Sequence, residues 1–135
     1  MNDADLLLRI AETLKQEIAP AVDSEYPKTQ AFMAAVVLQK LGRQVSLAPM
    51  HARAASADLD VLIVELNARA ADAPRAVREA VEDLARSRDA GGLSRLIEAL
   101  YASRDALGQR HFGDLLALVR RTLRSDIERR MEYAG

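Results

Sequence analysis

Apolar residues recur along this chain at intervals of three and four positions, the spacing that places them on one side of an α-helix. No segment alternates polar and apolar residues over a useful length, which argues against strands. Proline and glycine interrupt the helical pattern at Pro20, Pro49, Pro74, Gly91 and Gly108. The pattern predicts an all-α protein, folded as a compact bundle of five or six antiparallel helices with no sheet.

Two helices are expected in the first part of the chain. The first runs from about residue 3 to 19, and a proline-containing loop joins it to the second, from about 28 to 47. One side of the second helix carries a stripe of large apolar residues, namely Met33, Val37, Leu41 and Val45. Further apolar residues widen this stripe beyond an ordinary half-buried face. We expect this helix to be the most deeply buried of the bundle, with more apolar surface than one neighbour can cover.

The remaining helices are delimited by prolines and glycines. Pro49 either begins a third helix or kinks one long helix, which ends near residue 71. Asp58 and Asp60 are expected near a helix N-terminus, where the helix dipole favours acids. A fourth helix is expected from about residue 74 until Gly91 and Gly92 close it, and two more at about 93–107 and 112–132.

Length and composition indicate a single globular domain over residues 1–135. The chain is 50% hydrophobic and 29% charged, which is ordinary globular composition. It has no cysteine, so a disulfide or a thiolate metal site cannot form. The acidic start and the absence of a long apolar run predict a cytoplasmic protein without a membrane segment. A net charge of −1 argues against nucleic acid as a partner.

Charge is unevenly distributed along the chain. Residues 1–27 hold two cations and six acids, which gives −4, whereas residues 28–57 hold four cations and no acid, which gives +4. The four cations are Lys28, Lys40, Arg43 and Arg53, and we take them as candidate contacts for a partner or an anion. Two interpretations stay open. Lys40 and Arg43 share a helix face and could meet an acidic or phosphate-bearing ligand, or these cations could pair with acids of the first helix such as Glu12.

No catalytic residue, metal site or cofactor is expected from the sequence. His51 and His111 lack a second ligand at the spacing that a helical metal site uses. The acids Glu79, Glu82 and Asp83 lie one helical turn from arginines, which indicates a self-neutralising surface rather than an acid–base pair. Sequence motifs for phosphate cradles, zinc proteases and serine hydrolases are absent.

Two segments carry a family resemblance. The first half has a helix ending in an "I-x-P" turn (Ile18, Pro20), an aromatic loop residue (Tyr26) and then an Ala-rich helix that closes on Arg43. The segment "FGDLLALVRRTLRSDIERRM" resembles the family's last helix. The family consists of small helical proteins encoded beside kinases of the aminoglycoside-phosphotransferase type, often near acyl-CoA dehydrogenase-like enzymes. The resemblance implies an accessory subunit for a kinase that acts on hydroxy acids or their coenzyme A thioesters.

Taken together, the sequence predicts a non-enzymatic accessory or interaction protein, with a phosphotransferase-like kinase as the partner that the resemblance implies. Two alternatives stay open. One is a helical domain that binds a small anionic molecule between its helices through Lys40 or Arg43. The other is a homodimer in which the apolar second or last helix packs on its twofold mate.

Overall fold

The computed structural model describes residues 1–132, and within that range every element is helical. The all-α prediction is confirmed. In chain order the elements are α1 (Asp3–Thr13), a π-helical turn η1 (Leu14–Ile18), α2 (Ala19–Ala21), α3 (Glu25–Arg69), α4 (Arg75–Ser87), α5 (Ala90–Ala102), α6 (Arg104–Leu107) and α7 (Gln109–Met131). Contacts divide the chain into two compact units. The expectation of a single domain stays a prediction.

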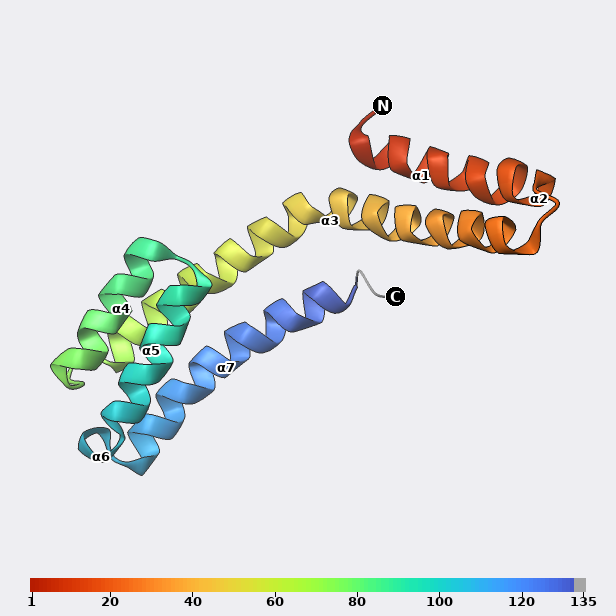
Figure 1. Cartoon of the computed structure of the whole chain (residues 1–135). Helices are drawn as coiled ribbons and strands as arrows, with labels where there is room; N and C mark the ends of the chain where they lie inside the picture. Colours follow the sequence, from red (N-terminus) through yellow and green to blue (C-terminus); the bar gives the residue numbers. More distant parts are fainter. Residues whose placement is uncertain (133–135) are drawn as a thin grey trace. The chain divides into compact units, whose positions relative to one another are not determined.

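The first unit, residues 1–53 with the chain from Arg129 onward, is built on a helical hairpin. The segment from α1 to α2 runs antiparallel to the first half of α3, and a short turn near Asp23 joins them (Figure 1). Asn2 begins α1 with a capping box, because its side chain accepts from the Asp5 N–H while the Asp5 carboxylate accepts from the Asn2 N–H. Hydrogen bonding of this kind satisfies backbone donors that the first helical turn would otherwise leave unpaired.

Small residues form the seam between the two arms of the hairpin. The buried residues on the first arm are Ala4, Ala11 and Ala19, and those on α3 are Ala35 and Gly42. A Cβ added at Gly42 would lie 3.0 Å from the Leu8 side chain and 3.4 Å from the Ala4 carbonyl oxygen, so the arms are in close contact. The arms therefore approach closely, and the residues that are fully buried between them are small.

The prediction that the second helix is the most deeply buried one is wrong. Its expected core stripe of Met33, Val37, Leu41 and Val45 is exposed to solvent. Ala35 and Gly42 face α1 instead, because their small size lets the backbones come together where larger side chains would hold them apart. The stripe is consequently turned away from the only neighbour that the hairpin offers.

The π-helical turn η1 keeps the alanines of the first arm in line. Ala4 and Ala11 are seven residues apart, which is close to two turns of an α-helix, but Ala19 follows Ala11 by eight. A π-turn accommodates one extra residue. With η1 between them, Ala11 and Ala19 both lie fully buried against α3.

The second unit, residues 54–128, holds a conventional hydrophobic core. It contains the second half of α3 with α4, α5, α6 and most of α7 (Figure 1). The large side chains that are almost completely buried are Leu66, Val77, Leu84, Leu96, Leu100, Leu115 and Val119. All of them belong to this unit, so the described part of the first unit contains no large side chain that is fully buried.

Several helix boundaries differ from those expected. Pro49 lies inside α3, so the kinked-helix alternative describes the region better than a new helix does. Asp60 therefore lies within a helix rather than at its start, and its carboxylate pairs with Arg88 at 2.8 Å. Gly91 and Gly92 belong to the first turn of α5, while Arg88, with φ +50°, ends α4 in the left-handed conformation.

Candidate interaction surface

Six exposed aliphatic residues of the hairpin lie on one flank of the seam, while Leu8 and Val36, which are also exposed, lie on the other. We define the apolar flank as Leu6, Ile10 and Ile18 on the first arm and Val37, Leu41 and Val45 on α3. Each of these residues is between 42% and 56% exposed. Six half-exposed aliphatic side chains on a structure of this size are unusual, since a soluble surface normally scatters such residues singly.

Helical spacing places these six residues together. Ile10 precedes Ala11 by one residue and Ile18 precedes Ala19 by one, so both isoleucines are rotated the same way from the seam. On α3, Leu41 precedes Gly42 in the same manner. Because the two arms are antiparallel, equal rotations away from the seam point to the same side of the hairpin. The six residues therefore form one surface rather than two.

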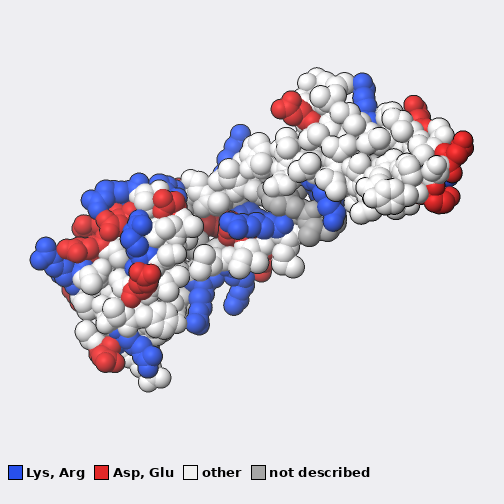
Figure 2. Space-filling view, viewed as in Figure 1, with Lys and Arg blue, Asp and Glu red and all other residues white. Residues whose placement is uncertain are grey.

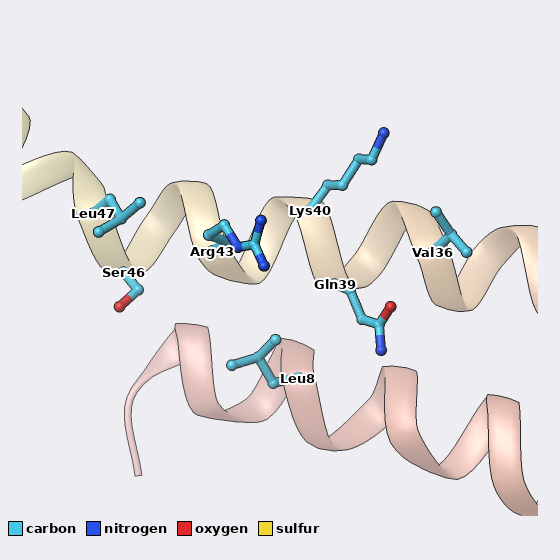
Figure 3. Close-up of a pocket in the computed structure, with 7 residues that line it drawn as sticks. All are labelled: Leu8, Val36, Gln39, Lys40, Arg43, Ser46 and Leu47. Carbon is cyan, nitrogen blue, oxygen red and sulfur yellow. The ribbon is translucent and has the colours of Figure 1, made fainter. Parts of the chain in front are cut away.

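The opposite flank of the seam carries an open groove. It has a volume of about 600 Å³ and is lined by Leu8, Val36, Gln39, Lys40, Arg43, Ser46 and Leu47. In Figure 3 the side chains of Leu8, Gln39 and Ser46 point across the gap between α1 and α3. The Lys40 side chain points away from α1. Leu8 is two residues from Leu6 and Ile10, about 200° around the helix, which places this groove on the other side from the apolar flank.

The structure brings together only two of the four candidate cations. Lys40 and Arg43 line the same groove, whereas Lys28 lies near the start of α3 and Arg53 lies 25 residues further along. At 1.5 Å per residue that separation corresponds to roughly 38 Å along a helix axis. No single small ligand could contact all four, although an extended partner could.

Pairing with the acidic first helix does not neutralise Lys28, Lys40 or Arg53. Within residues 1–132, Lys28, Lys40 and Arg53 form no salt bridge, and neither does Glu12. The interpretation in which these cations pair with acids of the first helix required such salt bridges across the hairpin. The two arms of the hairpin therefore carry opposite charge. None of Lys28, Lys40 and Arg53 forms an ion pair with the first arm.

Charged side chains are distributed differently over the two units. Figure 2 shows dense Lys, Arg, Asp and Glu side chains over α4 and α5, and a mostly uncharged surface over the visible side of the hairpin. Acids gather at the end of the hairpin near α2, where the sequence has Glu17, Asp23 and Glu25. The first unit is therefore the less polar part of the chain in this view.

The two histidines have structural partners. His111 donates from Nε2 to the Arg69 carbonyl oxygen at 2.8 Å, which satisfies a backbone acceptor at the end of α3. His51 lies 3.1 Å from Glu132, measured between Nε2 and the carboxylate oxygen. Across the described residues, no three His, Asp or Glu side chains come together in a way that could hold a metal ion. In the same residues no helix is long and apolar enough to cross a bilayer.

Reasoning from sequence missed the apolar flank as a surface. Three of its residues, Val37, Leu41 and Val45, were expected in the core because aliphatic side chains at helical spacing are usually buried. One signal could have corrected this assignment. Ala4 and Ala11, and likewise Ala35 and Gly42, repeat at seven residues on the two arms, which is the interval expected of a close helix–helix seam.

Comparisons with known proteins add no relative. No protein-family model matches the chain, and no curated protein or solved structure matches it. The resemblance to the kinase-associated family stays a prediction that rests on the sequence segments quoted above.

Proposed function

We propose that this chain is a non-enzymatic interaction protein and that the apolar flank of its hairpin binds another protein chain. The observation that carries the proposal is the contrast between the units. The second unit has a core of seven large side chains that are almost completely buried, whereas the hairpin has no such core and leaves six aliphatic side chains half-exposed on one flank. A cluster of this kind is characteristic of a protein–protein interface.

The free energy available at this flank is large enough to drive association. Complete burial of a Leu, Ile or Val side chain is worth about 1.5–3 kcal/mol, and these residues are roughly half-exposed. Six of them could therefore contribute roughly 5–9 kcal/mol from this chain alone. Association itself costs several kcal/mol in lost freedom, so the partner must also bring apolar surface.

A helical partner fits the shape of the flank best. Each arm presents a row of side chains spaced by four residues or by eight, and such rows receive the ridges of another helix. The kinase-accessory role is the form of this function that the family resemblance implies, and it depends on that resemblance for its partner.

Co-purification with a kinase of the type that the resemblance implies tests the accessory role. The full chain should be co-expressed with such a phosphotransferase-like kinase, and the complex measured after affinity purification. Leu41→Glu, which places a charge on the apolar flank, should abolish the complex. The matched control is Val64→Glu, because Val64 is an aliphatic residue on the same helix that is 68% exposed in the second unit. Equal binding by all three chains would contradict the role of the flank.

The groove on the opposite flank supports a second candidate function, the binding of a small anionic molecule. Its volume of about 600 Å³ lies within the range of ligand pockets, and two cations line it. Phosphorylated and carboxylated metabolites should then raise the Tm of the wild-type chain. They should not raise the Tm of the Lys40→Glu, Arg43→Glu double variant. A screen in which no anion shifts the wild-type Tm would remove this candidate.

A further inference from the structure

We propose that the groove binds an amphiphilic anion, a free molecule with one carboxylate or phosphate head group on a single aliphatic chain. The inference rests on the second candidate function above, the binding of a small anion, because it names the chemical class of ligand for the same groove. It is independent of the apolar flank, which lies on the other side of the seam. Each part of such a ligand corresponds to one part of the groove lining (Figure 3).

Aliphatic side chains line the groove from both arms. Leu8 lies on α1 and is 42% exposed, whereas Val36, which is 47% exposed, and Leu47 lie on α3. Leu8 points across the gap in Figure 3 and is close to Gly42, where an added Cβ would lie 3.0 Å from its side chain. A chain in the groove would therefore remove aliphatic surface of both arms from water, which favours binding in proportion to the area covered.

The charged part of the lining is entirely cationic. Of the seven lining residues, Lys40 and Arg43 are cations and none is an acid. Lys40 forms no salt bridge within residues 1–132. Gln39 and Ser46, whose side chains point across the gap, add hydrogen-bond donors on the same helix. Carboxylate and phosphate oxygens can accept from all four of these side chains, so the head group of the ligand should lie along α3.

A ligand with both parts fits the groove better than a ligand with one. An inorganic anion would meet only exposed cations, and such pairs contribute little because water and salt screen them. A neutral aliphatic molecule would displace water from Lys40 and Arg43 without replacing its hydrogen bonds. An aliphatic anion avoids both losses. Each methylene that the groove covers should tighten binding by up to about fourfold.

Methyl resonances of the full chain locate and quantify the binding of defined probes. Octanoate and octyl phosphate should shift the carbon-13 methyl resonances of Leu8, Val36 and Leu47, which line the groove. The resonances of Leu41 and Val45 should stay unchanged, because these residues lie on the apolar flank. Acetate and inorganic phosphate lack the chain and should bind at least about 10-fold more weakly than octanoate and octyl phosphate.

A thermodynamic cycle isolates the contribution of the head group. Octanol has the chain of octanoate without the charge, and the Lys40→Gln, Arg43→Gln double variant has the groove without its cations. Octanoate should bind the double variant about 3- to 30-fold more weakly than the wild type, the combined effect of two exposed ion pairs. Octanol should bind both chains with the same Kd. Circular dichroism shows whether the double variant has kept its helices.

Val36→Glu places an acid inside the groove. The new carboxylate would lie one helical turn before Lys40, where it can pair with that lysine and repel the head group. The Kd for octanoate should rise at least about 10-fold. Val64→Glu is the matched control, because Val64 is an exposed valine on the same helix in the second unit and the charge change is identical. It should leave the Kd unchanged.

The outcomes separate this inference from the small-anion function. Acetate and inorganic phosphate that bind the groove as tightly as octanoate and octyl phosphate would overturn the amphiphilic ligand and leave the small-anion function standing. Shifts centred on Leu41 and Val45 would overturn the groove as the site. An octanoate Kd that is the same in the double variant would overturn recognition of the head group by the two cations. No saturable shift with any probe would overturn both the inference and the small-anion function.

Discussion

At the scale of single residues, glycines determine how closely helices approach in this protein. A Cβ added at Gly92 would lie 2.5 Å from Ser87 Oγ and 3.2 Å from the Leu84 Cα. At Gly42 the nearest atoms belong to the Leu8 side chain, which is partly exposed and can move. Backbone atoms next to Gly92 cannot give way as easily, so α5 begins against α4 only because residue 92 lacks a side chain.

Gly92→Ala should therefore destabilise the chain by about 1–3 kcal/mol, the usual cost of overpacking. Gly113→Ala is the matched control, because Gly113 lies in α7 with nothing within 4 Å of the added Cβ. Alanine at that position should stabilise the helix by about 0.5–1 kcal/mol. Urea unfolding followed by circular dichroism measures both effects. Equal free energies of unfolding for the two variants would show that contact of the added methyl group with Leu84 and Ser87 does not destabilise Gly92→Ala.

Asp89, at the start of the same helix, makes a pH-dependent contribution to the free energy of unfolding. Its carboxylate caps α5 by accepting from the Gly92 N–H at 2.8 Å. This hydrogen bond, with a second from the Ser87 side chain, lowers the pKa of Asp89 below its usual value of 3.8. The unfolded chain therefore binds the proton more readily than the folded chain does. The contribution is complete above the unfolded pKa and is lost as the pH falls through the lower folded pKa.

Replacing Asp89 by asparagine keeps a capping oxygen but removes the titration. The stability advantage of the wild type over Asp89→Asn should be constant at neutral pH and should shrink as the pH falls below about 4. Thermal unfolding of both chains between pH 2 and pH 7 measures the difference. An advantage that stays the same down to pH 2 would contradict the lowered pKa.

Residue-level chemistry could be predicted from the sequence only where partners are close along the chain. The acid-free span that holds Lys40 and Arg43 is visible without a structure. The contact between His51 and Glu132 joins residues 81 positions apart, and the bond from His111 to the Arg69 carbonyl spans 42. Local spacing carries no information about either pair, because both depend on how separate helices pack.

At the scale of elements, the sequence predicts which segments are helical more reliably than it predicts which helices contact each other. Helical periodicity identified every long helix, because a period of 3.6 residues follows from local backbone geometry. It could not show that Pro49 would stay inside α3, since tertiary contacts can compensate for one lost hydrogen bond. Nor could it show that Ala35 and Gly42, rather than Leu41, would face α1.

Core substitutions should show the difference between the units. Leu66 is fully buried in the second unit, so Leu66→Ala should cost roughly 2–5 kcal/mol. Leu41 is about half-exposed in the hairpin, so Leu41→Ala should cost less than about 1 kcal/mol. Chemical denaturation of both variants compares the two losses. A similar loss for both variants would indicate that the hairpin has a core of its own.

At the scale of the whole molecule, the net charge is only −1 although the two arms of the hairpin carry opposite charge, −4 over residues 1–27 and +4 over residues 28–57. The all-α class was predictable because the entire chain lacks period-two segments. The interaction surface was not predictable, because aliphatic residues at helical spacing are typical both of a buried core and of a protein–protein interface. Only the placement of alanine and glycine in the seam distinguishes the two, and it makes the exposed flank the central feature of the account.

Co-purification of this chain with a phosphotransferase-like kinase tests the role of the apolar flank most directly. We predict that the wild type and Val64→Glu retain the kinase and that Leu41→Glu, whose added charge lies on the flank, loses it. Retention of the kinase by Leu41→Glu would contradict binding of a partner chain through the apolar flank.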